Sequence, residues 1–488
     1  MKTTIRAFLL AAGLALNIAL LKGVALPFAV VFALDLALLV DTALFLIRRD
    51  RDMLQPLALI FIVFALRVGL PAAMLLAGAR PLSAVALSWT QPRYWQPGFY
   101  LCMTGCFALG LAFVLTPAGG LRAVRQHAAF TPTSNSVRRT AQLLMLLGGV
   151  LWLTYMAANF GGVRGIAAAL TGGLVRGVRY HTEGTSRYGF VARQLLFWGA
   201  LIWGVSRYEA TRKVRSALVP TLAALVVLIT NGGRVAAVSA PVLLLLVVWY
   251  LRGRTVGVGR ASFARIARWA VGGVAALLLF IAGGLFVKGY RGGGGVSTAM
   301  RLASMRAVGD ELNFSAWYET GLLHPFAFAI RGGGGSYHPP LGRYLFSGYT
   351  AYFTGVNDVL KPGQLIVQQT LGTSTWGIHT GAFVDLYIGF GLLGTVAGGM
   401  LLGVALKVVY VSLAQRARSS IEVVVYAFTF WHIFWVLFES VVGVVSGWFE
   451  NGLILFVLLG LAAMLRTPRA ARRVQAPRRL APAAGSAR

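Results

Sequence analysis

Apolar runs of about twenty residues recur along almost the whole chain, separated by short polar segments. A helix of that length matches the hydrocarbon thickness of a bilayer, and only helices or closed barrels satisfy their backbone hydrogen bonds there. We therefore predict an all-α, polytopic integral membrane protein with about twelve membrane-spanning helices. The expected spans are residues 7–21, 25–47, 54–78, 97–117, 141–160, 190–206, 217–230, 235–251, 269–288, 380–411, 421–445 and 451–466.

The two ends of the chain differ from each other in character. The first residues, MKTTIRAFLLAAGLALNIALLKG, are basic and then apolar, as in a signal peptide, but no convincing cleavage motif follows. We expect an uncleaved first span. Residues 1–466 are predicted to form a single membrane-embedded domain. Residues 467–488, rich in Pro, Ala and Arg, are predicted to be a disordered tail that contacts membrane lipids.

The distribution of Lys and Arg predicts the orientation of the spans. With the N-terminus inside, the segments expected on the inner side are all basic, as cytoplasmic loops of membrane proteins are. These segments are 48–52, 118–140, 207–215, 252–268, 415–418 and the tail. We predict a bacterial inner-membrane protein with both termini in the cytoplasm and two long periplasmic loops, 161–189 and 289–379.

Composition and motifs narrow the function classes. Of 488 residues, 57% are hydrophobic and 12% are charged, which excludes an ordinary soluble protein. The net charge of +31 has no soluble basic domain to carry it, so nucleic-acid binding is not expected. The chain lacks GxxxxGK[ST], HExxH and GxSxG motifs. Cys102 and Cys106 are interpreted as small apolar helix residues, and neither a metal nor a cofactor is expected.

Arginines on the predicted outer side are the most unusual feature of the sequence, because that side normally avoids cations. Arginine offers planar, permanently charged donors that match phosphate oxygens. Arg176 and Arg179 share one face if their segment is helical. We expect a site for a multiply charged anion, best a lipid diphosphate; the alternative is a GC-rich codon bias with arginines bound to lipid headgroups. The candidates are Arg164, Arg176, Arg179, Arg187, Arg234 and Arg67.

Two of these arginines indicate a cavity that opens outward. Arg234 lies between spans of about 15 residues, and each would reach only about 23 Å as a helix, less than the hydrocarbon core of about 30 Å. The connection TNGGR is therefore expected below the outer surface. Arg67 lies inside the third span, either as a wall of the same cavity or in an ion pair with Asp35 or Asp41.

Three residues are candidates for proton transfer on the outer side: Glu319, His379 and Asp385. A carboxylate or an imidazole is suited to accept a proton from a hydroxyl group. Asp385 is expected near the membrane edge, where neighbouring arginines favour its ionised form.

Three stretches together resemble the Wzy-type polymerases of bacterial oligosaccharide repeat units. They are NFGGVRGIAAALTGGLVRGVRYHTEGTSRYG, then ITNGGRVAAVSAPVLLLLVVWYLRGR, and RYLFSGYTAYFTGVNDVL followed by STWGIHTGAFVDLYIGFGLLGTVAGGMLLGVAL. The likeness covers about 160–411 and lies in the layout of spans and loops. In place of an acidic residue directly before the Phe-Gly pair, this chain has Gly389, with Asp385 four residues earlier.

This resemblance implies a fold like the C-type glycosyltransferases and a defined reaction. A sugar hydroxyl of one undecaprenyl-diphosphate-linked repeat unit would attack the anomeric carbon of the growing chain, as in O-antigen or capsule synthesis, and undecaprenyl diphosphate would leave. The implied partners are these glycans, a chain-length regulator and a flippase. Two alternatives remain open: an O-antigen ligase that transfers glycan to lipid A-core, and a transporter or flippase for lipid-linked sugars.

Overall fold

The computed structural model describes residues 2–78, 91–117, 134–160, 186–231, 234–253, 380–415 and 420–438, with positions 326, 327, 329, 330 and 452. Within these residues every regular element is a helix and no strand occurs. Seven helices in this described part of the chain are long and apolar enough to cross a membrane. The structure thus confirms an all-helical protein of membrane type. The GT-C-like arrangement and the full number of spans stay predictions, and the expected spans 269–288 and 451–466 fall on residues not described, apart from position 452.

The chain divides into two compact units. The second contains α7 (Ser134–Phe160), α9 (Ser186–Thr211) and α10 (Val214–Asn231), while α11 (Arg234–Gly253) begins in the second and ends in the first. The first unit contains α1 (Lys2–Leu21), α2 (Phe28–Asp50), α3 (Pro56–Phe64), the π-helix η1 (Ala65–Gly69), α4 (Leu70–Leu76), α6 (Pro92–Leu115), α19 (Ala382–Val409), the π-helix η5 (Tyr410–Gln415) and α20 (Ser420–Phe438).

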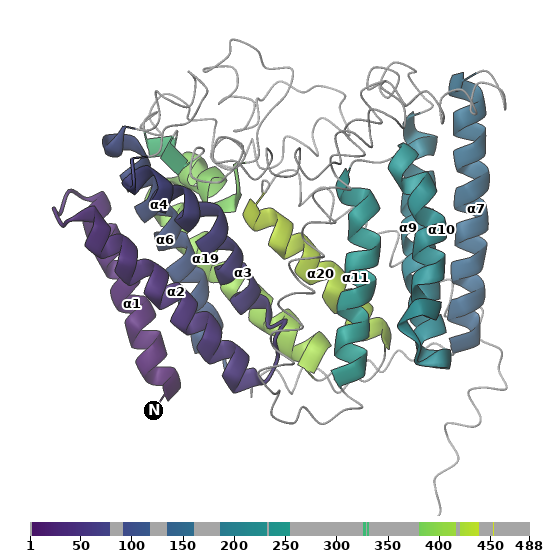
Figure 1. Ribbon diagram of the computed structural model, residues 1–488, viewed down its shortest axis with the longest axis horizontal. Coiled ribbons are helices and arrows are strands. Elements are labelled where there is room, and N and C mark those ends of the chain that lie inside the picture. The colour runs from purple at the N-terminus through teal and green to yellow at the C-terminus, as the bar shows by residue number, and fades with distance from the viewer. Residues whose placement is uncertain are drawn as a thin grey trace, which may run out of the picture. The chain divides into compact units, whose positions relative to one another are not determined.

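Helix α6 forms the core of the first unit. Every residue from Gly98 to Val114 is buried, as expected for a helix that is apolar on all sides. Helices α1 and α19 both pack against it (Figure 1). Small residues allow the close approach of α19: a Cβ atom added at Gly403 would lie only 2.2 Å from the carbonyl oxygen of Leu109. Cys102 and Cys106 are buried free thiols in this helix.

Helix α19 is broken at Gly391, so our prediction of one continuous span over 380–411 is wrong. Gly391 has φ 66° and ψ −159°, a conformation that essentially only glycine adopts. The hydroxyl of Thr395 donates to the carbonyl of Phe383 over 3.3 Å, although twelve residues of straight helix would separate them by about 18 Å. The first part of α19 therefore folds back against the second. The second part, 392–415, still exceeds the about 20 residues that a span needs.

Two further boundaries differ from the sequence-based prediction. Helices α10 and α11 have 18 and 20 residues, hence about 27 Å and 30 Å of length, so both are longer than the about 15 residues expected. Helix α10 still falls short of a hydrocarbon core of about 30 Å, and the recessed tip stays a prediction. Helix α9 begins at Ser186. Arg187 is therefore a helical residue, and the predicted loop 161–189 extends too far.

In the second unit, α7 and α9 approach closely through two glycines. A Cβ atom at Gly148 would lie 3.0 Å from the backbone nitrogen of Leu196, and one at Gly199 would lie 2.9 Å from the carbonyl oxygen of Ala141. Ala200, Ala224 and Ala240 form the small core between α9, α10 and α11. In lipid there is no hydrophobic driving force between helices, so small side chains favour association by letting the backbones approach closely enough for van der Waals packing.

Candidate functional site

The predicted site residues divide into three groups. Arg67 and Asp385 are described with their side chains, and both belong to the first unit. Arg187 and Arg234 begin helices, in the first turns of α9 and α11. The remaining five lie outside the described residues: Arg164, Arg176, Arg179, Glu319 and His379.

Asp385 lies in the first turn of α19, and its side chain is 0% exposed. The hydroxyl of Thr380 donates to its Oδ1 over 2.6 Å. Gly381 precedes the helix with φ 78°, and its carbonyl accepts from the backbone N–H of Asp385 over 3.2 Å. A negative charge in the first turn is favoured by the helix dipole. The backbone and Thr380 thus fix the orientation of this carboxyl group.

Asp385 lies deeper than the membrane edge where we expected it. Its neighbour Phe383 packs over Gly105, where an added Cβ atom would lie 2.5 Å from the aromatic ring. Gly105 is in the middle of α6, which runs from Pro92 to Leu115. The break at Gly391 explains the error, because the folded-back first part carries Asp385 into the interior of the bundle.

Arg67 lies on the π-helix η1, which interrupts the third span. The backbone N–H of Leu70 bonds to the carbonyl of Ala65, five residues earlier. Proline lacks an N–H, and its ring clashes with the carbonyl four residues before it. For Pro71 that carbonyl belongs to Arg67, so the proline accounts for the local widening. Such single π turns occur frequently at functional sites.

A pair of stacked aromatic rings brings these two segments together. The rings of Phe64 and Phe383 have centroids 5.7 Å apart and planes at 23°. Phe64 ends α3, three residues before Arg67, and Phe383 precedes Asp385 by two residues. Phe438 of α20 closes the cluster, 4.8 Å from Phe64. The acid and the guanidinium therefore belong to neighbouring segments inside the first unit.

No protein-family model, no curated protein and no solved structure matches this chain. Its function is therefore inferred from its residues and their contacts.

A second polar cluster, which sequence reasoning missed, surrounds Asp52 in the turn between α2 and α3. Its Oδ2 accepts from the hydroxyls of Tyr410 over 2.8 Å and Tyr250 over 2.9 Å. Its Oδ1 accepts from the backbone N–H of Leu54 over 2.9 Å and from the indole of Trp249 over 3.3 Å. Burial raises the pKa of Asp52, and these hydrogen bonds oppose that rise.

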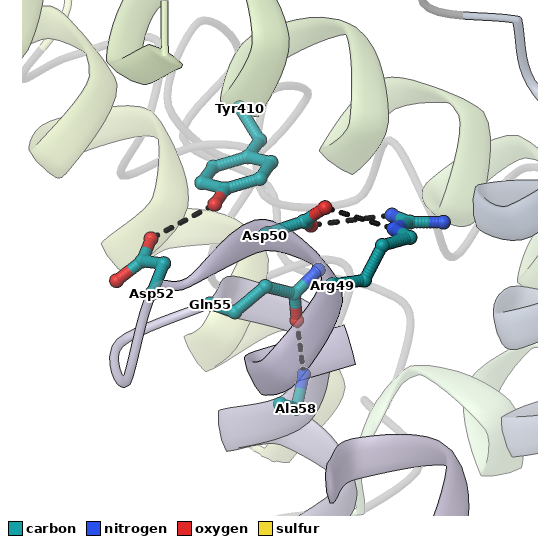
Figure 2. Close-up of polar contacts among 6 residues, drawn as sticks. All are labelled: Arg49, Asp50, Asp52, Gln55, Ala58 and Tyr410. Carbon is teal, nitrogen blue, oxygen red and sulfur yellow. Dashed lines mark hydrogen bonds and ion pairs between the residues drawn. The ribbon is translucent and has the colours of Figure 1, made fainter. Parts of the chain in front are cut away.

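Figure 2 shows that the charged residues at the end of α2 and in the turn after it have different partners. Tyr410 points at Asp52, whereas Arg49 turns away and pairs with Asp50 through bonds of 2.8 and 3.2 Å. Gln55 caps α3 by accepting from the backbone N–H of Ala58 over 2.6 Å. The turn is therefore tied to its own helices and to η5.

The sequence offered only a weak signal for this second cluster. The charges of RRDRD at 48–52 predict a basic inner segment, and its side of the membrane stays a prediction; the structure extends α2 through Asp50. The tyrosines that bind Asp52 come from α11 and η5, and a third, Tyr426 of α20, lies 3.2 Å from the hydroxyl of Tyr250. Nothing in the spacing of residues so far apart indicates that they meet. The common clue is that each lies near the end of a predicted span on the same predicted side.

Proposed function

We propose that this chain is a membrane-embedded glycosyltransferase that polymerises undecaprenyl-diphosphate-linked oligosaccharide repeat units at the periplasmic face of the inner membrane. The supporting observation is the Phe64–Phe383 stack, which joins the segments of Arg67 and Asp385 within the membrane-type bundle. An acid and a permanent cation are the two groups that this transfer needs.

In the proposed mechanism Asp385 acts as the general base. Its carboxylate takes the proton from the acceptor hydroxyl while that oxygen forms a bond to the anomeric carbon of the donor. The bond between the anomeric carbon and the diphosphate oxygen breaks, and its electron pair leaves with undecaprenyl diphosphate. Thr380 holds Oδ1, which positions the carboxylate before substrate arrives.

The arginines are proposed to stabilise the departing diphosphate. Negative charge builds up on its oxygens in the transition state, and preorganised cations lower the energy of that charge. Arg67 supplies one such cation from the π-helix. Arg164, Arg176, Arg179, Arg187 and Arg234 are the further diphosphate ligands predicted from the sequence alone.

The test uses a strain that lacks this gene, complemented with the wild type or a variant, and its surface polysaccharide on a gel. We expect single repeats on lipid A-core in the deletion strain and in Asp385→Asn and Arg67→Ala, with a full ladder in the control Asp41→Asn. Core without any repeat would assign the chain as a ligase instead. An unchanged ladder in the deletion strain excludes both enzymes.

A transporter of lipid-linked sugars is the second candidate, because broken helices and charges deep in the membrane are typical of transporters. The break at Gly391 and the buried Asp385 both fit that pattern. Purified protein in vesicles with lipid-linked repeat units separates the two functions. Longer glycans together with free undecaprenyl diphosphate support the polymerase, whereas movement of the substrate without a new covalent product supports the transporter.

A further inference from the structure

Asp35 is a buried acid in the middle of an apolar helix bundle, and the proposed reaction does not use it. It lies on α2 with 1% exposure, and Asn17 of α1 faces it with 0% exposure. The side-chain amide of Asn17 donates to Oδ1 of Asp35 over 3.1 Å and to the carbonyl of Gly13 over 3.0 Å. An ionisable residue inside a membrane-spanning segment is expensive to bury and is a functional candidate by default.

The hydrogen bonds of this pair lack one donor. The amide of Asn17 has two hydrogens, and both are engaged. Its own Oδ1 and the Oδ2 of Asp35 have no partner among the described residues. Rotating the side-chain amide of Asn17 by 180° would bring its oxygen to Asp35, and the pair would still have too few hydrogen-bond donors. Buried acceptors that are left unsatisfied destabilise the folded state, because they have lost their hydrogen bonds to water without replacement.

No cation among the described residues compensates a charge at Asp35. Arg6 of α1 pairs with Asp41 instead. On α6, the groups within electrostatic range are Tyr100 and Cys102, both neutral in their usual state. Arg67 is the charged residue of η1, which also packs on α2, but within the described part of the chain the side chain that hydrogen-bonds Asp35 is Asn17. An ionised Asp35 would therefore be a buried, unpaired charge.

We propose that Asp35 and Asn17 form a proton-binding site, in which Asp35 is a neutral carboxylic acid that donates from Oδ2 to Oδ1 of Asn17. One proton removes the charge and satisfies both open acceptors at once. It also makes the contact between α1 and α2 reciprocal, with each side chain donating to the other. The site shares no residue with the proposed catalytic site, so either can fail without the other.

Infrared spectroscopy of the full-length protein in lipid tests the protonation directly. With aspartate ¹³C-labelled at its carboxyl carbon, we expect the carbonyl band of a protonated acid at neutral pH. The band should lose intensity in Asp35→Asn and keep its full intensity in Asp41→Asn. Absence of such a band in the labelled wild type, or unchanged intensity in Asp35→Asn, overturns the proposal and leaves an ionised acid bridged by water.

Thermal unfolding gives a second, independent readout. If the folded protein holds a proton that the unfolded chain releases, the stability falls as the pH rises. We expect the Tm of the wild type to decline relative to that of Asp35→Asn as the pH rises above about 4, where the unfolded chain releases its proton, and the decline to end at the pH at which the folded protein releases it too, because each pH unit in between changes the unfolding equilibrium about tenfold per proton. Parallel curves for the two proteins would contradict a bound proton in this range.

Discussion

The hydroxyl of Tyr410 donates a 2.8 Å hydrogen bond to Oδ2 of Asp52, across a sequence separation of 358 residues. This bond ties the turn between α2 and α3 to the far end of the broken helix α19. Helix α19 therefore connects the two polar clusters of the first unit, with Asp385 at its start and Tyr410 directly after its end.

Removal of the Tyr410 hydroxyl is expected to weaken this connection. Tyr410→Phe deletes one hydrogen bond to a carboxyl group and should lower the free energy of unfolding by about 1–3 kcal/mol, measured by thermal or denaturant unfolding in detergent. Tyr208→Phe is the matched control, because Tyr208 is also buried and its hydroxyl makes no hydrogen bond within the described part of the chain. Equal losses in both variants would show that the bond to Asp52 contributes nothing.

The pKa of Asp52 predicts a pH dependence of stability. Burial raises its folded pKa above the ordinary 3.8, so the folded state binds its proton more tightly than the unfolded state. The resulting stability is complete below about pH 3.8 and is lost as the pH rises through the folded pKa. The Tm difference between the wild type and Asp52→Asn should change in that window. A difference that stays constant across it would contradict a raised pKa.

Gly391→Ala tests the break in α19. The positive φ of 66° disfavours any side chain, and such a conformation costs of the order of 1–3 kcal/mol in a residue other than glycine. We expect a lower Tm together with loss of polymer in the complementation assay. Gly149→Ala is the control, because Gly149 lies inside helix α7 with open space around an added Cβ. That variant should be neutral or up to about 1 kcal/mol more stable.

Pro71→Ala tests whether the π-helix positions Arg67. With an N–H restored at this position, α3 and α4 can join into a regular helix, which turns Arg67 away from its present direction. We expect stability to be kept or increased while polymer length falls sharply on the gel. Pro97→Ala in α6 serves as the comparison, since this proline is also inside a helix. Wild-type ladders from Pro71→Ala would mean that the π-turn does not serve the reaction.

Part of the candidate site was predictable from local sequence. Arg67 was identified because a charge inside an apolar run is costly in lipid, and Asp385 because an acid precedes a Gly-rich span. Their association was not predictable, since it depends on the contact of Phe64 with Phe383. The predicted depth of Asp385 was wrong for a related reason. The apolar character of the whole segment predicts one helix and does not show that the backbone reverses at Gly391.

By itself, the sequence determined that the chain forms apolar helices and where most of them lie. Within lipid every backbone N–H and C=O must be paired, and a helix pairs them between residues four apart, so a local pattern is sufficient. The tertiary structure decided which helix faces meet: Tyr410 with Asp52, Phe64 with Phe383, Asn17 with Asp35. These contacts depend on the packing of side chains from distant segments, and no local periodicity encodes them.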